Sequence, residues 1–431
     1  MVNTRSSGRP YNVVIYGASG FTGRLITEYF SKHYGSASSE PLRWAVAARS
    51  ESKLQATKKE LGVTDVPHIV ADSADLPSLR AMVEQTEVII TVVGPYLQYG
   101  ERLVEACANA GTHYLDLTGE SFFIKQMIER HHDAAVKSGA RIIHSCGMES
   151  IPADMGTYMV ARELKRAHDT RTDSVTLYLG KQRGGAVSGG TVASLVGVAE
   201  LVWKGGRKAR AELNDPYFLV PEGIKRPSKG YSRCAECTGF GYDSYLHGWV
   251  APAPIAPHDS KIVQRSNALL GEEYGPTSTF RFHAATPFPG IVLGFFKAAV
   301  VTLLYAFAKA AVWLPPTRWL LQRFVLPKSG DGPLPEVRSK GFFYVNLIGR
   351  GANGAAVEAT IGSEHGDGGY TETAKMISEC AVTLVRNAQQ LSSAGGIHTP
   401  ASALGAPLLK RLRAKGMVLE VGAPGSGKRL E

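Results

Sequence analysis

Cysteine is scarce in this sequence. The chain has five cysteines in 431 residues, an odd number that does not fit the dense disulfide framework of a small secreted protein. The N-terminal residues contain no apolar stretch and no long arginine-rich amphipathic stretch, so no signal or transit peptide is predicted. We therefore expect a reducing location, either the cytoplasm or a membrane surface that faces it.

Acidic residues are outnumbered as well: 38 Asp and Glu stand against 48 Lys and Arg, which gives a formal net charge of +10. The basic residues are spread along the chain, and no basic helix interleaved with aromatic residues is present. Nucleic acid is therefore not an expected partner, whereas an anionic cofactor and anionic lipid headgroups are. A single CxxC pair, Cys234 and Cys237, has no second pair at the spacing of a zinc site, so no metal is predicted.

The segment YNVVIYGASGFTGRL, residues 11–25, joins a strand-like apolar run to a helical stretch through three glycines. In such a loop the first glycine permits a tight turn, the second lets a pyrophosphate approach the backbone, and the third lets the helix pack on the strand. The position after a strand and before a helix favours a dinucleotide site over an ordinary turn, although the spacing is GxxGxxG. The expected cofactor contacts in this loop are Gly17, Ala18, Ser19, Gly20, Phe21, Thr22 and Gly23.

The end of the second predicted strand carries no acidic residue to bind a ribose hydroxyl. Arg49 and Ser50 stand there instead, and a guanidinium beside a hydroxyl suits a 2′-phosphate. We therefore expect NADP(H) rather than NAD. Gly94 and Pro95, which follow the fourth predicted strand, complete the expected cofactor site because ligands of open α/β sheets bind at the carboxyl ends of the strands.

Strand-like and helical stretches alternate from residue 11 to residue 147, the pattern of a Rossmann-type, doubly wound parallel sheet in an α/β protein. The alternation becomes irregular after Pro152, which indicates a second α+β domain. Residues 205–290 are rich in Pro, Gly and Tyr, and we interpret them mainly as loops. The expected units are a cofactor domain at 1–150, a second domain at 151–390 that holds the substrate or a dimer contact, and a C-terminal segment at 391–431.

A long apolar segment, residues 291–314, ends at Pro315 and Pro316. Its 24 residues are enough to span a bilayer, but on a helical wheel Lys297, Thr302 and Lys309 share one arc with Tyr305, opposite the large apolar residues. The favoured interpretation is an amphipathic hairpin with residues 317–326 that lies in a membrane surface, an insertion of about 289–327. Two alternatives stay open: a helix pair buried in the core or in a homodimer interface, and a transmembrane helix.

Six motifs accompany the glycine loop: VGPY at 93–96, YLDLTGE at 114–120, CGMESIPAD at 146–154, SGGT at 188–191, GDGGY at 366–370 and GGIHTP at 395–400. With this set the chain resembles the saccharopine dehydrogenase-like oxidoreductases, in particular the group of trans-acting enoyl reductases and of a protein associated with lipid droplets. The resemblance spans nearly the whole chain. It implies NADP(H) at the glycine loop, a second domain inserted after the sixth strand, and a C-terminal segment that returns to the first domain.

The resemblance covers both amino-acid and lipid chemistry. Because an exposed amphipathic insertion does not suit an enzyme of small charged metabolites, we expect a lipophilic acyl or polyketide-type substrate, reduced at an enoyl C=C bond or at a C=O or C=N bond. One alternative is a nonenzymatic NADPH-binding adaptor on a membrane or lipid droplet. The other is an amino-acid dehydrogenase of the saccharopine type.

The sequence does not name the proton donor of such a reductase, because no YxxxK pair follows the fourth strand. Tyr96, Glu120 and Thr191 are the candidate catalytic residues, since the first two follow predicted strands and the third opens a helix. Asp116 has the same standing as Glu120, with a turn as its alternative role. Further acids at the presumed domain junction are Glu149, which replaces the aspartate of many relatives, and Asp154.

Overall fold

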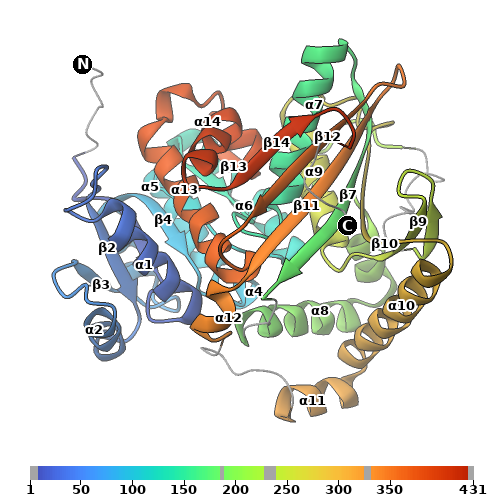
Figure 1. Ribbon diagram of the computed structural model, residues 1–431. Helices are drawn as coiled ribbons and strands as arrows, with labels where there is room; N and C mark the ends of the chain where they lie inside the picture. The colour runs from blue at the N-terminus through green and yellow to red at the C-terminus, as the bar shows by residue number, and fades with distance from the viewer. Residues whose placement is uncertain (1–7, 185–188, 228–238, 325–331, 426–431) are drawn as a thin grey trace.

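The computed structural model describes residues 8–184, 189–227, 239–324 and 332–425. Within these ranges the chain forms two seven-stranded sheets that stand side by side, each with helices packed against it (Figure 1). The first sheet is wholly parallel and the second is mixed, which confirms the predicted α/β class with a second domain.

The first sheet has the strand order β13-β6-β5-β4-β1-β2-β3. A parallel sheet covered on both faces requires continuous apolar runs, and the five residues of β2, WAVAA, are all buried. The chain reverses its direction of winding between β1 and β4, so the crevice for a ligand opens at the carboxyl ends of these strands. The strands and helices of this part are β1 (Tyr11–Tyr16), α1 (Phe21–Tyr34), β2 (Trp44–Ala48), α2 (Glu51–Glu60), β3 (His68–Val70), α3 (Leu76–Val83), β4 (Thr86–Thr91), α4 (Tyr96–Tyr99), α5 (Glu101–Ala110), β5 (His113–Leu115), α6 (Ser121–Ser138) and β6 (Arg141–Ile143).

The second sheet has the order β14-β12-β11-β7-β10-β9-β8. Its central strands β7, β11 and β12 pack against α7, where a Cβ on Gly156 would lie 2.6 Å from Leu347, so a glycine is needed for this close approach. The elements are α7 (Ile151–His168), β7 (Thr172–Arg183), α8 (Gly189–Asn214), β8 (Gly241–Asp243), β9 (Gly248–Pro252), α9 (Ala256–Leu269), β10 (Arg281–Pro289), α10 (Val292–Trp313), α11 (Pro315–Phe324), α12 (Pro335–Ser339), β11 (Phe342–Gly351) and β12 (Ala356–Ser363).

The last part of the chain is shared between the two sheets. A π-helical turn (Gly368–Glu372) leads into α13 (Thr373–Arg386), which packs on α1 and β4 of the first domain. A short 3-10 helix (Ala388–Gln390) follows, and β13 (Gly396–His398) then pairs with β6. After α14 (Pro400–Ala414), β14 (Val418–Gly422) pairs with β12 of the second sheet, so residues 391–425 do not pack on the first domain alone.

A buried charge network fixes this C-terminal part to α1. The fully buried Glu379 of α13 accepts hydrogen bonds from Tyr29 and Tyr34 of α1. Arg411 of α14 completes the network, with its Nε 2.8 Å from Glu379 Oε2. Because a buried carboxylate is stable only when it is paired and hydrogen-bonded, these contacts hold α1, α13 and α14 in one arrangement.

The apolar segment forms the helical hairpin of α10 and α11 at the periphery of the molecule (Figure 1). Among the described residues, α10 alone is long and apolar enough to cross a membrane by length and composition. Only 6% of its most apolar stretch is buried, so the alternative of a helix pair inside the core is wrong. Gly294 and Ala298 face the protein, Thr302 and Tyr305 are partly exposed, and Lys297, Lys309 and most of the large apolar residues are exposed.

Candidate active site

The glycine loop between β1 and α1 has the geometry of a phosphate cradle. The backbone N–H groups of Gly17 and Ala18 donate to the Ala47 carbonyl at 2.8 and 3.1 Å, which ties the loop to the end of β2. Gly17 has φ +92°, a backbone conformation that favours glycine. A Cβ on Gly23 would lie 2.2 Å from the Gly17 carbonyl oxygen, so no larger residue fits where α1 meets the loop.

The start of α1 is free to bind an anion. Gly20 caps the helix without a side-chain hydrogen bond, and the first turn contains no acidic residue, so the N–H groups there are not neutralised by the protein's own carboxylates. The ring of Phe21 packs edge-on against Tyr370 at 5.1 Å and lies 5.6 Å from the Arg338 guanidinium. The Phe21 side chain therefore packs against residues that follow the first domain in the sequence, and its backbone N–H can contact the cofactor. These residues fit a dinucleotide pyrophosphate.

Arg49 and Ser50 follow β2, next to the carbonyl that holds the glycine loop. The Arg49 side chain is exposed, whereas the Ser50 hydroxyl caps α2 by accepting a hydrogen bond from the Lys53 N–H at 3.4 Å. Arg49 is therefore the better placed of the two to contact a 2′-phosphate, and Ser50 orients the helix beside it.

We expect Arg49→Ala to weaken NADPH binding by about 10- to 100-fold and to leave NADH binding nearly unchanged, because a charge-assisted hydrogen bond to the 2′-phosphate is lost. Titration of cofactor fluorescence measures both affinities. Arg166→Ala, which removes an exposed arginine of α7, is the matched control. Equal losses for NADPH and NADH would show that Arg49 does not read the phosphate.

Gly94 and Pro95 lie where β4 ends and α4 begins, and the peptide bond between them is cis. A Cβ on Gly94 would lie 3.5 Å from the Tyr96 ring and 3.8 Å from Ser194 Oγ of α8. This glycine therefore faces both the sheet edge and the helix that the second domain places over it.

Tyr96 does not have the environment that we expected of a catalytic residue. Its side chain is 6% exposed, and its hydroxyl donates to the Thr91 carbonyl and accepts from the Leu117 N–H, both at 3.3 Å. Burial raises the pKa of this phenol well above its ordinary value. Both hydrogen-bonding capacities are used to join the ends of β4 and β5, so the hydroxyl is not available to a substrate.

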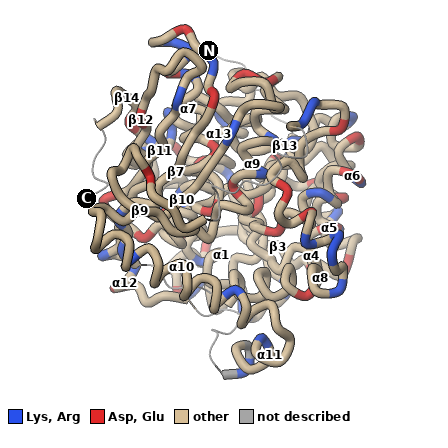
Figure 2. The backbone as a smooth tube through the Cα atoms, turned by 90° about the vertical axis from the view of Figure 1, so that its right-hand side faces the viewer, with Lys and Arg blue, Asp and Glu red and all other residues tan. Residues whose placement is uncertain are grey.

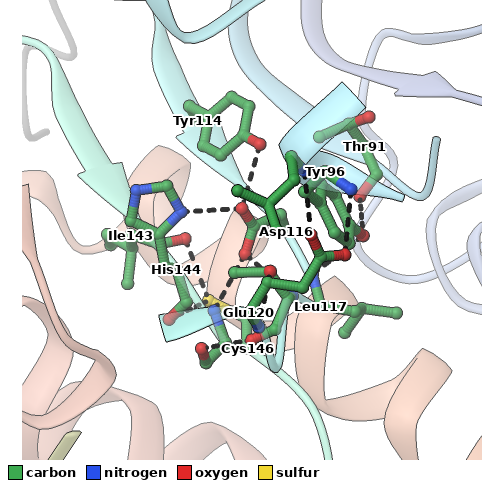
Figure 3. Close-up of polar contacts among 12 residues, drawn as sticks. Thr91, Tyr96, Tyr114, Asp116, Leu117, Glu120, Ile143, His144 and Cys146 are labelled. Atoms are coloured by element: carbon green, nitrogen blue, oxygen red, sulfur yellow. Dashed lines mark hydrogen bonds and ion pairs between the residues drawn. The ribbon is translucent and has the colours of Figure 1, made fainter. Parts of the chain in front are cut away.

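Glu120 is also buried, and its carboxylate accepts three hydrogen bonds from the protein. Its carboxylate accepts a hydrogen bond from the Tyr96 N–H at 3.0 Å (Figure 3). It also accepts from the Leu97 N–H at 2.8 Å and from the Ser194 hydroxyl at 2.6 Å. Burial raises its pKa, while the three donors lower it. Glu120 therefore fixes α8 to the start of α4. Thr191 lies one turn earlier on α8 and is exposed, and Ser188 of the same motif lies outside the described residues.

Asp116 is the hub of the buried polar contacts at this edge. It is fully buried and accepts four hydrogen bonds, from Tyr114 Oη at 2.9 Å, Thr118 N at 3.1 Å, His144 Nδ1 at 2.7 Å and Ser145 N at 2.9 Å (Figure 3). A carboxylate with this many donors is a structural acceptor rather than a base. It holds the ends of β5 and β6 in register.

Glu149 is the acid at this edge whose environment suits proton transfer. Its side chain is only partly exposed, and Oε2 lies 2.5 Å from where a Cβ on Gly119 would stand, so the missing side chain makes room for the carboxyl group. Burial, followed by the negative charges of Glu120 and Asp116, raises its pKa to about 7. A carboxyl group that is about half protonated at neutral pH can donate a proton.

A helix of the second domain adds another acid that the sequence did not indicate. Asp259 of α9 is buried, with Oδ1 3.4 Å from Ser150 Oγ and Oδ2 without a partner in the described chain. Burial and the charge of Glu149 raise its pKa. We call Glu120, Glu149 and Asp259 the acidic cluster. No lysine or arginine among the described residues forms an ion pair with them.

His258, next to Asp259, joins the two domains rather than acting as a base. Its ring nitrogens lie 3.0 Å from the hydroxyls of Ser121 and Ser145. Burial lowers its pKa to about 3, so the imidazole is neutral. Asp154 is likewise structural, because it accepts hydrogen bonds from the Ser266 hydroxyl and the Ala401 N–H.

Two further features do not belong to this site. A cavity of about 950 Å³ lies at the amino ends of β1, β2 and β4, the opposite edge of the sheet, and is lined by residues such as Asn12, Trp44 and Glu87. The described residues contain no group of three His, Cys, Asp or Glu side chains that could hold a metal ion. Cys234 and Cys237 lie outside the described residues.

Known proteins resemble this chain in its first domain and over nearly its whole length. Residues 13–143 match the family model of the saccharopine dehydrogenase NADP binding domain. A Mycobacterium tuberculosis protein, provisionally named a trans-acting enoyl reductase, is 36% identical over 424 residues, which cover 96% of this chain and 97% of that protein. The trans-acting enoyl reductase of Mycobacterium leprae is 33% identical over 428 residues, which cover 95% and 97%. The chain belongs to the saccharopine dehydrogenase-like family.

The family model assigns NADP(H) as the cofactor, and the chain is an NADP-dependent oxidoreductase, which confirms both expectations. Among solved structures, the apo saccharopine dehydrogenase (L-Glu forming) of Saccharomyces cerevisiae is similar, with a TM-score of 0.52 and 14% identity over 96% of this chain and 99% of that chain. This likeness shows a shared fold. The family that the sequence motifs indicated, the saccharopine dehydrogenase-like oxidoreductases, is confirmed.

Proposed function

We propose that this oxidoreductase uses NADPH to reduce a conjugated C=C bond in a lipophilic acyl or polyketide-type substrate. The observation that carries the proposal is the full-length similarity to proteins named trans-acting enoyl reductases, at 33% and 36% identity. The glycine loop, the open start of α1 and Arg49 support it because they provide for the cofactor. Bound NADPH supplies the hydride.

Reduction of an enoyl group also needs a proton. Hydride addition at the β-carbon leaves negative charge on the substrate's carbonyl oxygen and α-carbon, and a proton must then reach the α-carbon. We assign this donor role to Glu149, because its pKa of about 7 keeps a fraction of the carboxyl group protonated at neutral pH. Glu120 has a positioning role, because the three hydrogen bonds that it accepts hold α4 and α8 beside Glu149.

The acidic cluster argues against a saccharopine-type amino-acid substrate. Such a substrate carries several carboxylates, which need basic side chains. Glu120, Glu149 and Asp259 have no lysine or arginine partner among the described residues, and burial raises the pKa of each, so the cluster offers no positive charge to a bound carboxylate. An uncharged enoyl group needs no such partner.

The test of the reaction is NADPH oxidation with α,β-unsaturated acyl thioesters of increasing chain length, with the reduced product identified by mass spectrometry. We expect turnover that rises with chain length and none with saccharopine and NADP. Ketone and imine substrates of similar length measure reduction at C=O and C=N. Tight NADPH binding without turnover of any substrate would contradict the reductase and favour a nonenzymatic adaptor.

We expect Glu149→Gln to lower kcat by about 100- to 1,000-fold, the usual contribution of a general acid, without changing NADPH affinity. Because the acid form is the active one, the wild-type rate should fall as the pH rises through about 7, and this decline should be absent from the variant. Glu129→Gln, on the exposed side of α6, is the matched control. An unchanged pH profile in Glu149→Gln would assign the proton to another group.

A further inference from the structure

The hairpin of α10 and α11 has its apolar side turned away from the protein. Residues of α10 at positions 294 and 298 are buried, whereas Leu303 is 70% exposed and Phe307 is 74% exposed. A helix on the surface of a soluble protein normally has the reverse orientation. Apart from Phe295, which packs on Trp249, the exposed large apolar residues of the hairpin are Ile291, Val292, Leu293, Phe296, Val300, Leu303, Leu304, Phe307, Leu314, Trp319 and Leu320. We call them the outer face.

The inner side of α10 is docked firmly. A Cβ on Gly294 would lie 2.6 Å from the Phe288 carbonyl oxygen, so the helix backbone touches β10 directly. The Trp249 indole of β9 donates to the Ile291 carbonyl at 2.8 Å, and its ring packs edge-on against Phe295 at 4.9 Å. At the other end, Trp313 packs on the small cluster around Val202 of α8.

Both ends of α10 are therefore held against the protein. To cross a bilayer the helix would have to leave β9, β10 and α8, so the transmembrane interpretation conflicts with the observed packing. The outer face instead lies along the surface of the molecule, parallel to the helix axis.

Charge distinguishes a lipid surface from a second copy of the chain. Residues 291–324 contain four basic residues and no acidic residue. Lys297, Lys309 and Arg323 are exposed, and Arg318 is buried near Glu200 of α8. In Figure 2, α11 lies at the bottom of the molecule and α10 lies above it. Two outer faces packed against each other would place the three exposed cations together with no acidic residue on the hairpin to pair with them, whereas anionic headgroups would neutralise them.

We propose that the outer face of α10 and α11 inserts sideways into one leaflet of a phospholipid membrane that contains anionic lipids. The apolar side chains lie at the boundary between headgroups and acyl chains, and the lysine side chains extend to the phosphates. Trp319 stands at the depth that tryptophan prefers. This surface is independent of the proposed reductase reaction.

The experiment is flotation of the full chain with vesicles made of equal parts phosphatidylglycerol and phosphatidylcholine. We expect the wild type to float with them, and the double variant Leu303→Asp, Phe307→Asp to bind at least about tenfold more weakly, because two carboxylates would enter the apolar layer. Both side chains are exposed, so the variant should keep the thermal midpoint and NADPH affinity of the wild type. Tryptophan emission should shift to shorter wavelength only when vesicles bind.

The matched control is Val70→Asp, Val136→Asp, which alters two exposed apolar residues on the first domain and should float like the wild type. Weaker flotation with pure phosphatidylcholine supports the assigned role of the cations. Two results would overturn the proposal. One is a wild type that stays in the soluble fraction. The other is a wild type that sediments as a dimer without lipid, does not float, and becomes a monomer in the Leu303→Asp, Phe307→Asp variant.

Discussion

Gly23→Ala should abolish measurable NADPH binding. The added Cβ would lie 2.2 Å from the Gly17 carbonyl oxygen and 2.8 Å from the Ala18 Cα, and both are backbone atoms that no rotamer change can move. The helix must therefore shift away from the loop, and the N–H groups that face the pyrophosphate lose their alignment. We expect an affinity loss of more than about 100-fold, measured by titration of cofactor fluorescence.

A second glycine provides the control for this substitution. A Cβ on Gly197 of α8 would meet nothing within 4 Å, so Gly197→Ala should keep NADPH affinity and raise helix stability by about 0.5–1 kcal/mol. Circular dichroism separates a local shift from global unfolding in Gly23→Ala. Wild-type affinity in Gly23→Ala would mean that the loop does not bind the phosphates.

Asp116→Ala should have the largest effect on stability. Four buried donors, on Tyr114, Thr118, His144 and Ser145, would lose their common acceptor. Because each unsatisfied buried group costs about 1–3 kcal/mol and the site relaxes in part, we expect the free energy of unfolding to fall by about 4 kcal/mol. Urea denaturation measures this change.

Asp116→Asn keeps the shape and one acceptor oxygen, so it should lose less stability than the alanine variant. Asp75 supplies a matched position, because it is exposed and makes no side-chain cap hydrogen bond to α3. Asp75→Ala should stay within about 0.5 kcal/mol of the wild type. If Asp116→Ala were equally mild, water would have to replace the carboxylate, and Asp116 would not be a hub.

The first sheet was predictable because its strands are buried on both faces. Continuous apolar runs such as β2 then identify strands directly, and the glycine loop marks where the first one ends. The same logic placed Glu120 and Asp116 at the correct edge. It does not reveal which polar groups are already hydrogen-bonded within the protein. The Tyr96 hydroxyl donates to the Thr91 carbonyl and accepts from the Leu117 N–H, and the sequence pattern predicted neither bond.

Residues 205–290 were harder to predict because α9 buries polar side chains. Lys261 donates to the carbonyls of Leu213 and Pro257, and Arg265 donates to those of Leu219 and Ile397. These bonds allow the charged side chains to be buried. The helix therefore has no clear apolar stripe, and the sequence was interpreted mainly as loops. Asp259 on this helix was missed for the same reason.

The position of β13 late in the sequence determines when the first sheet can be completed during synthesis. The ribosome completes β6 at Ile143, but the strand that pairs with its open side begins only at Gly396. At about 5–20 residues per second, the nascent chain keeps that edge uncovered for roughly 10–50 s, while the second domain emerges. Arg265 of that domain then donates to the Ile397 carbonyl as the strand arrives. The sheet of the cofactor domain is therefore completed only after the second domain has been synthesised.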